Sequence, residues 1–277
     1  MISPYGPRKL GPSVDVTGAA AFFDLDRTLI AGSSAFQFGR ASYQAGLVTR
    51  RQLARDAWAN VQFRLRGSTD EATEALRERI FTSIEGRSVR ELERLAAPVL
   101  AGVLPRVYPR MLEIAHAHQD AGRLVYIVTA ASQEMAEMLA HVLAFDGGIG
   151  SRSEIVDGVY TGRPGPGPFT YREGKAEAIR ELAAAEGIDL AASYAYSDSE
   201  SDLPMLRAVG NPVAVNPDAT LCAVARDEGW EVIRLDRLGR RLKVLASFVA
   251  MAAVGVVGRG VAGRGPVAAV PRATARR

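Results

Sequence analysis

Residues 19–28 read AAAFFDLDRT. A short apolar run that ends in an acidic residue is typical of a strand buried in a parallel sheet, so we expect a strand over Ala19–Asp24. Similar apolar runs occur at residues 123–129 (RLVYIVT), 193–197 (SYAYS) and 212–216 (PVAVN), and stretches with helical spacing separate them. Strands that alternate with helices predict an α/β fold with a parallel sheet, whose ligands bind at the carboxyl ends of the strands.

A long segment interrupts this pattern. Residues 34–104 contain no strand-like run, and their apolar residues recur at helical spacing, which predicts an all-helical insert too long to be a loop. Within it, Ser88 precedes Glu91 by three residues, as in a helix-starting capping box. Residues 146–172 indicate a hairpin that turns at Asp157-Gly158. The expected organisation is therefore a flexible arm (1–18), a core (19–33 and 105–238), the helical insert (34–104) and an apolar, then basic, tail (239–277).

Composition narrows the choice of chemistry. The chain has 277 residues and one cysteine, Cys222, which excludes an intramolecular disulfide and is expected to be a buried structural thiol. Only three of its 34 basic residues are lysines, so the lysine of a chemical motif attracts attention. The first 18 residues lack the apolar stretch of a signal peptide, and we expect a cytoplasmic protein.

Polar side chains gather at the expected carboxyl ends of three strands. The segments FFDLDRTL, YIVTAAS and YSDSESD end these strands, and Lys175 begins the helix between the second and the third. Each signal alone is weak, because an acidic pair after a strand is an ordinary loop in many proteins. Their shared order and strand placement together predict one site.

The four pieces DLDRT (24–28), Thr129, Lys175 in EGKAEAI and SDSESDLPML (197–206) resemble the haloacid dehalogenase superfamily. Within it, residues 19–235 are similar to the subfamily IB hydrolases, which include phosphoserine phosphatase. This resemblance implies a Rossmann-like parallel sheet flanked by helices, with the insert as an all-helical cap. It also implies a phosphatase that acts on a small phosphorylated substrate.

The resemblance assigns a role to each motif residue. Asp24 would be the nucleophile that forms an aspartyl-phosphate. Asp26 would protonate the leaving oxygen and then activate water. Thr129 would donate a hydrogen bond to the phosphoryl oxygens, and Lys175 would neutralise charge on Asp24 and on the transferred group.

A cation is expected beside these carboxylates, because they repel a phosphate. Asp24, the backbone carbonyl of Asp26 and Asp198 would hold Mg²⁺, which prefers oxygen ligands. Asp202 would lie behind these ligands and help to position them. Alternatively, it would only place a negative charge at the start of a helix. The three histidines have no spacing that places a metal-binding pair on one helix face.

The substrate is less well defined than the reaction. Phosphoserine phosphatases carry a glutamate nine positions after the nucleophile, where this chain has Ser33, so phosphoserine is a doubtful substrate. Ser33 and Arg64 are candidate substrate contacts, whereas Trp58, Phe63 and Phe81 are expected in the core of the insert. Two alternatives remain: a phosphotransferase that uses the same intermediate, and a non-catalytic module that binds a membrane or a partner.

The charge of the chain is unevenly distributed. Its formal net charge is +3, but residues 234–277 carry ten basic side chains and one acidic side chain, so residues 1–233 are net negative. We therefore expect no nucleic-acid partner. Residues 244–258 carry no charge and fall short of the roughly 18 residues of a spanning helix. Three alternatives are open for this tail: a docked apolar helix, contact with a partner or weak contact with the inner face of the membrane, and disorder.

Overall fold

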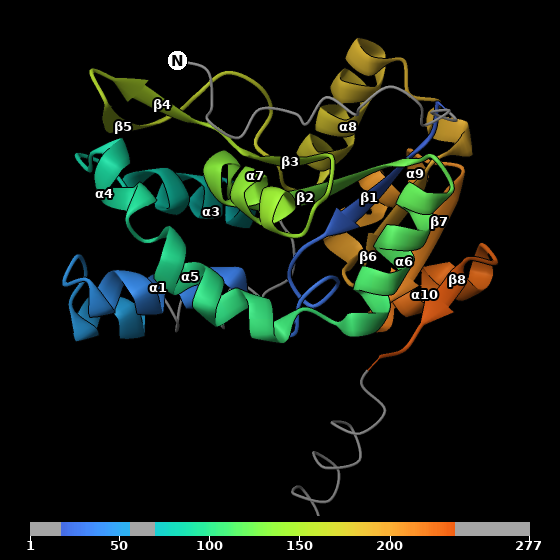
Figure 1. Cartoon of the computed structure of the whole chain (residues 1–277), viewed down its shortest axis with the longest axis horizontal. Helices are drawn as coiled ribbons and strands as arrows, with labels where there is room; N and C mark the ends of the chain where they lie inside the picture. The colour runs from blue at the N-terminus through green and yellow to red at the C-terminus, as the bar shows by residue number, and fades with distance from the viewer. Residues whose placement is uncertain (1–17, 56–69, 236–277) are drawn as a thin grey trace, which may run out of the picture. The chain divides into compact units, whose positions relative to one another are not determined.

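The computed structural model describes residues 18–55 and 70–235, and a six-stranded sheet lies at its centre (Figure 1). Every neighbouring pair of strands is parallel, in the order β3-β2-β1-β6-β7-β8. This confirms the predicted α/β fold. The strands are β1 (Ala20–Asp24), β2 (Leu124–Ser132), β3 (Gly147–Ser151), β6 (Tyr194–Ser197), β7 (Asn211–Val215) and β8 (Glu231–Ile233).

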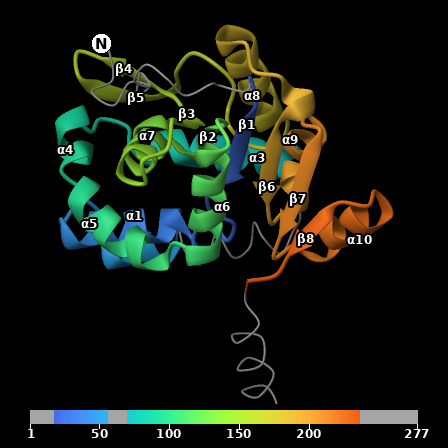
Figure 2. The same ribbon diagram turned by 45° about the vertical axis from the view of Figure 1, so that its right-hand side comes forward.

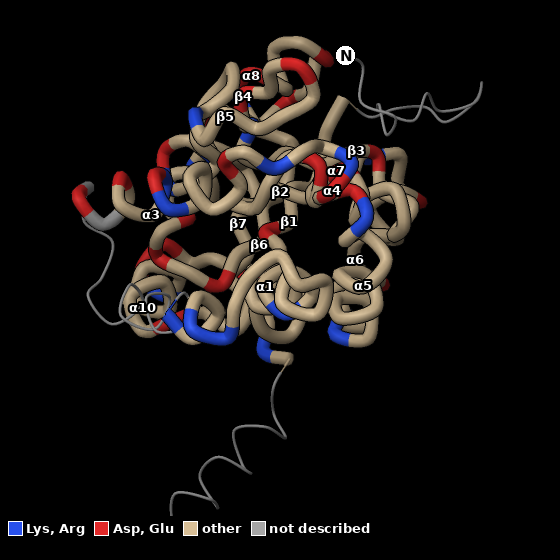
Figure 3. Tube along the Cα trace, turned by 90° about the vertical axis from the view of Figure 1, so that its left-hand side faces the viewer, with Lys and Arg blue, Asp and Glu red and all other residues tan. Residues whose placement is uncertain are grey.

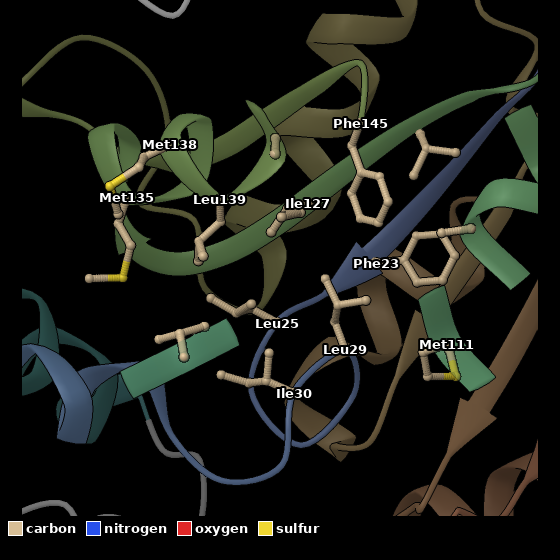
Figure 4. Packing of buried hydrophobic residues seen from close by; sticks show 14 of the residues in the cluster. Phe23, Leu25, Leu29, Ile30, Met111, Ile127, Met135, Met138, Leu139 and Phe145 are labelled. Carbon is tan, nitrogen blue, oxygen red and sulfur yellow. The ribbon is translucent and has the colours of Figure 1, made fainter. Parts of the chain in front are cut away.

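Helices cover both faces of this sheet, since β1 is buried on both. Ala21 and Phe23 point to the side of α6 (Pro109–Asp120) and α7 (Gln133–Val142). Figure 4 shows Phe23 close to Phe145 on this side, with Ile127 and Leu139 nearby. Phe22 packs on the opposite side, which is covered by α8 (Glu173–Glu186), α9 (Leu203–Arg207) and α10 (Ala219–Asp227). The alternation of a strand thus builds two apolar layers from one short sequence run.

The order of connections creates the place for a site. From β1 the chain passes through the insert to β2 and β3, then crosses back to β6 on the other side of β1. Figure 2 shows β1 between β2 and β6. Open parallel sheets bind ligands where the strand order reverses in this way, at the carboxyl ends of the two diverging strands. In this chain those ends are Asp24 and Ser197.

The described part of the insert is helical, as predicted. It contains α1 (Ser34–Gln44), α3 (Asp70–Thr82), α4 (Val89–Glu93) and α5 (Ala96–Val103), and the short 3₁₀ helix η1 (Leu104–Arg106) begins at its last residue. The hydroxyl of Ser88 accepts a hydrogen bond from the backbone nitrogen of Glu91 (3.2 Å), which confirms the predicted helix start. Phe81 is buried, also as predicted. Trp58, Phe63 and Arg64 lie outside the described residues.

A hairpin joins the insert to the rest of the chain. Strands β4 (Ser153–Val156) and β5 (Val159–Pro164) turn at Asp157 and Gly158, both with positive φ, which confirms the predicted turn. Tyr160 of β5 exchanges backbone hydrogen bonds with the insert, donating to Arg87 and accepting from Gly86 (2.9 Å each). Strand β5 of the hairpin is therefore hydrogen-bonded through its backbone to residues 86–87 of the insert.

Cys222 differs from its prediction, whereas the predictions for the two ends of the chain fall on residues that the structure does not describe. Cys222 on α10 is only half-buried, and Arg234 donates a hydrogen bond to its sulfur (3.3 Å), so the prediction of a buried thiol was wrong. Within residues 18–55 and 70–235, no helix has the length and apolar character needed to cross a membrane. Residues 1–17 of the predicted arm (1–18) and the whole predicted tail (239–277) lie outside the described residues.

One buried histidine makes the fold sensitive to pH. His118 of α6 is 7% exposed, and a hydrogen bond joins its Nε2 to the hydroxyl of Tyr196 on β6 (2.7 Å). The rings of Tyr194 and Phe23 also contact it. Burial, together with the nearby Arg123, lowers the pKa of His118 to about 4 from an ordinary value of 6.5.

We predict that this shift destabilises the protein in mild acid. Between pH 7 and pH 5 the unfolded chain gains a proton on His118 that the folded chain does not, which removes about 1–2 kcal/mol of unfolding free energy. His118→Gln cannot titrate, so its unfolding free energy should fall less over the same range. Urea unfolding at the two pH values measures this, with His116→Gln, an exposed position of the same helix, as the control. Equal pH dependence in all three proteins would contradict the prediction.

Candidate active site

The two aspartates of the first motif lie at the end of β1 and have different surroundings. Asp24 is the last residue of the strand and is 7% exposed. Asp26 lies two residues beyond, where its Oδ1 accepts a hydrogen bond from the backbone nitrogen of Ser34 (2.8 Å). Its Oδ2 accepts another from the hydroxyl of Ser33 (3.2 Å). The first turn of α1, which begins the insert, therefore holds the carboxylate of Asp26.

A buried lysine connects strands that are distant in sequence. Lys175 is 3% exposed in the first turn of α8, and its Nζ donates to Oδ1 of Asp24 (2.5 Å) and to Oδ2 of Asp202 (2.7 Å). Gly174 makes this placement possible, because a Cβ there would lie 1.8 Å from the carbonyl oxygen of Phe169. Only glycine lets α8 begin so close to the preceding loop. The dipeptide Gly174-Lys175 is therefore the sequence feature that marks the position of the buried lysine.

The second acidic motif follows β6. The hydroxyl of Ser197 donates to Oδ2 of Asp202 (2.6 Å), while Oδ1 of Asp202 is buried without a hydrogen-bond partner in the described part of the chain. Asp202 precedes α9 but makes no side-chain bond to the start of that helix. The hydrogen bonds of Asp202 are therefore those of a residue that positions Lys175, rather than those of a helix cap.

Asp198 has its own cationic partner. It is 4% exposed, and Nη2 of Arg27 lies 2.7 Å from its Oδ2. Arg27 was not predicted from the sequence as a site residue, although its place between Asp26 and Thr28 is a usable signal. Asp218 was not predicted either; its carboxylate accepts hydrogen bonds from the backbone nitrogens of Glu200 and Leu221 and so stabilises the loop after β6.

Thr129 is buried, but β2 does not end there. The strand continues to Ser132, and its pairing with β3 shifts register between Val128 and Ser132. The hydroxyl of Thr129 accepts a hydrogen bond from the backbone nitrogen of Ala131 (3.2 Å). The prediction that the strand ends at Thr129 was therefore wrong, because the strand continues past a shift in its pairing register.

The cluster carries more negative than positive charge. Burial raises the pKa of Asp24 to about 7, with Asp202 and Asp26 adding repulsion and Lys175 opposing it. Burial and the charge of Asp24 likewise raise the pKa of Asp198 to about 8, against the opposite effect of Arg27. Burial disfavours the ammonium of Lys175, but Asp202 and Asp24 outweigh it and raise its pKa. Acidic positions lie at the ends of β1 and β6 (Figure 3).

The structure thus brings together most of the predicted site residues. Asp24, Lys175 and Asp202 form one bonded chain, and Asp26 is held beside it by Ser33 and Ser34. Arg64 lies outside the described residues. Within the described ranges no three side chains of histidine, cysteine, aspartate or glutamate form a set that could hold a metal. The predicted metal site differs from such a set, since its third ligand is a backbone carbonyl.

Two curated proteins are similar to this chain over most of its length. Among curated proteins, the chain is 39% identical over 250 residues to "Phosphoserine phosphatase SerB1" of Mycobacterium tuberculosis (strain ATCC 25618 / H37Rv), covering 89% of this chain and 80% of that protein. It is 30% identical over 218 residues to "Histidinol-phosphatase" of Neisseria meningitidis serogroup C (strain 8013), covering 77% of this chain and 97% of that protein.

A solved structure has the same fold. A protein described as of unknown function from Bordetella pertussis Tohama I superposes with a TM-score of 0.69 and 29% identity, covering 78% of this chain and 98% of that one. The family model for haloacid dehalogenase-like hydrolases matches residues 21–207, which contain both aspartate motifs and Lys175. The chain therefore belongs to the haloacid dehalogenase-like hydrolase family and is an enzyme of that family with phosphatases among its relatives.

Proposed function

We propose that this protein hydrolyses small phosphate monoesters through an aspartyl-phosphate on Asp24. The observation that carries this proposal is the bonded chain from Asp24 through Lys175 to Asp202 at the point where the strand order reverses. A buried carboxylate oriented by a fixed ammonium is suited to nucleophilic attack. The names of the relatives support phosphomonoester chemistry as well.

The proposed reaction has two steps. In the first, an oxygen of Asp24 forms a bond to phosphorus, the bond from phosphorus to the alcohol oxygen breaks, and protonated Asp26 gives that oxygen its proton. In the second, Asp26 takes a proton from water as the water oxygen attacks phosphorus, which releases phosphate and restores Asp24. Ser33 and Ser34 keep Asp26 in place for both transfers.

Two further groups serve the transferred phosphoryl group. The ammonium of Lys175 offsets negative charge on Asp24 and on the phosphoryl oxygens, and its two carboxylate partners fix it before the reaction begins. Thr129 lies one residue beyond the position of β2 that pairs with Asp24. We assign its hydroxyl, and the backbone amides that follow, to hydrogen bonds with the phosphoryl oxygens.

The residues present fit a Mg²⁺ ion. Within residues 18–55 and 70–235, the four carboxyl groups (Asp24, Asp26, Asp198, Asp202) form ion pairs with only two cations, Lys175 and Arg27, so the cluster would carry two excess negative charges if all four were ionised. Burial and neighbouring carboxylates raise the pKa values of Asp24 and Asp198, and a cation held by both would stabilise their ionised forms. Asp24, Asp198 and the backbone carbonyl of Asp26 would hold the ion, with Asp202 behind them. When bound, Mg²⁺ would supply positive charge for the phosphate.

The substrate class follows from the surroundings of Asp26. The hydroxyl of Ser33 is already bonded to Asp26, and it carries no charge with which to pair a substrate ammonium group. We therefore propose a small phosphate monoester other than phosphoserine, with the insert (34–104) acting as a cap that closes over it. The different substrates named for the relatives are consistent with specificity that varies across one shared core.

We predict that Asp24→Asn abolishes phosphatase activity. Phosphate release by the full chain in MgCl₂ should be measured over phosphoserine, histidinol phosphate, sugar phosphates and lysophosphatidate, with EDTA as the metal control. Loss of the nucleophile should lower kcat by about a thousandfold or more. Unchanged thermal unfolding of the variant would show that the fold is intact. Turnover retained by Asp24→Asn, or no phosphate release from any ester by wild type, would contradict the mechanism.

Asp26→Asn should separate the two steps. 4-Nitrophenol leaves without a proton, so the variant should still phosphorylate Asp24 with 4-nitrophenyl phosphate, but it lacks the base for hydrolysis. We expect a burst of 4-nitrophenol close to one equivalent per enzyme, followed by turnover at least about a hundredfold slower than wild type. Rapid-mixing absorbance measures both. A steady rate with no burst at any enzyme concentration would argue against a trapped aspartyl-phosphate.

Removal of Lys175 should both destabilise the fold and abolish activity. Lys175→Met leaves Asp24 and Asp202 buried without their shared cation, which should cost about 3–5 kcal/mol of unfolding free energy. Adding Asp202→Asn to Lys175→Met removes one of the unpaired charges and should recover part of that loss, while activity stays absent. Urea unfolding of the two single variants and the double variant completes the cycle. Simple additivity of the two losses would contradict a direct charge interaction.

A further inference from the structure

Arg27 occupies an unusual backbone position between two proposed functional residues. It follows Asp26 and precedes Thr28, and its φ is +65°, a left-handed conformation that residues other than glycine rarely adopt. Such strain persists where the surrounding structure compensates for it. The side chain of Arg27 forms an ion pair with Asp198, whose Oδ2 lies 2.7 Å from Nη2 of Arg27.

Asp198 needs this contact because it has little access to water. Its side chain is 6% exposed, and Arg27 provides its only ion pair within residues 18–55 and 70–235. The other nearby cation, Lys175, bonds to Asp24 and Asp202 instead. A buried carboxylate without a partner is strongly unfavourable. Arg27 therefore pairs with a buried carboxylate of the cluster that Lys175 does not contact.

We propose that Arg27 is a resident counterion that yields Asp198 to the divalent cation and thereby sets the affinity of the site for metal. This inference rests on the proposed function, in which Asp198 is a metal ligand. Two cations that share one carboxylate repel each other, so the arginine and the metal compete.

The surroundings of the two partners decide which of them moves. The side chain of Arg27 is 43% exposed, so its guanidinium can return to water at little cost. Asp198 is fixed at the end of β6, where its backbone carbonyl accepts a hydrogen bond from the nitrogen of Asp218 (2.9 Å). The arginine is therefore the partner that moves away. Metal binding then includes the cost of displacing an ion pair, which weakens the apparent affinity.

The test is a calorimetric titration of MgCl₂ into the full chain after removal of metal with EDTA. Arg27→Gln should bind Mg²⁺ about fivefold or more tightly than wild type, since no cation is displaced. Without metal the variant should have a lower Tm than wild type, because Asp198 is unpaired. In saturating MgCl₂ this difference in Tm should disappear. The loss and recovery of Tm distinguish competition from a purely structural role.

Two control variants accompany the titration. Arg207→Gln removes an arginine–carboxylate pair of similar length (2.6 Å, to Glu228) on α9 and should leave the Kd for Mg²⁺ unchanged. Arg27→Lys retains a positive charge at the position and should bind Mg²⁺ within about twofold of wild type. If Arg27→Gln binds Mg²⁺ equally or more weakly than wild type, Arg27 does not compete and this inference fails alone. If wild type binds no Mg²⁺, the proposed metal site fails with it.

Discussion

The site depends on the ion pairs that the ammonium of Lys175 forms with Asp24 and Asp202. It joins the start of α8 to the end of β1 through Asp24 and to the segment after β6 through Asp202. Both carboxylates are almost fully buried, and buried carboxylates repel each other unless a cation lies between them. The parallel sheet brings these strand ends together because β6 returns to lie beside β1. The topology thus places carboxylates that repel each other close together, and the charge of Lys175 offsets much of this repulsion.

The same cluster connects the insert to the proposed acid and base, Asp26. Asp26 accepts hydrogen bonds from Ser33 and Ser34, at the residues where the insert begins. These bonds give the carboxylate one defined orientation, so any movement of α1 relative to β1 would change the position of Asp26. On the far side, Tyr160 of the hairpin holds the insert by backbone hydrogen bonds. Besides these hydrogen bonds, Val99 and Val103 of α5 pack against the core of the sheet, and one of the contacts of the insert is with the proposed acid and base.

Much of this arrangement could be predicted from the sequence, and the exceptions have physical causes. The apolar runs of β1 and β6 predicted their strands, because strands buried on both faces need such residues. Strand β3 (GGIGS) was missed, since a Cβ on Gly148 would lie 2.3 Å from the backbone of Ala136 and the strand needs small residues there. Ser33 was expected to contact substrate, but its hydroxyl lies against Asp26. A pattern of residue types places a side chain at a strand end, whereas its hydrogen-bond partner depends on how the next helix begins.

The two cations of the cluster are different residue types for a physical reason. Basic residues in this chain are overwhelmingly arginine, yet the buried position holds Lys175. An ammonium is compact and can point separate hydrogens at two carboxylates on different strands, whereas the wider, planar guanidinium requires more space and favours side-by-side bonding to one partner. Arg27 meets the opposite requirement, because it reaches one carboxylate from a half-exposed position. The buried ammonium is suited to a permanent contact, and the exposed guanidinium is suited to a contact that a metal ion can replace.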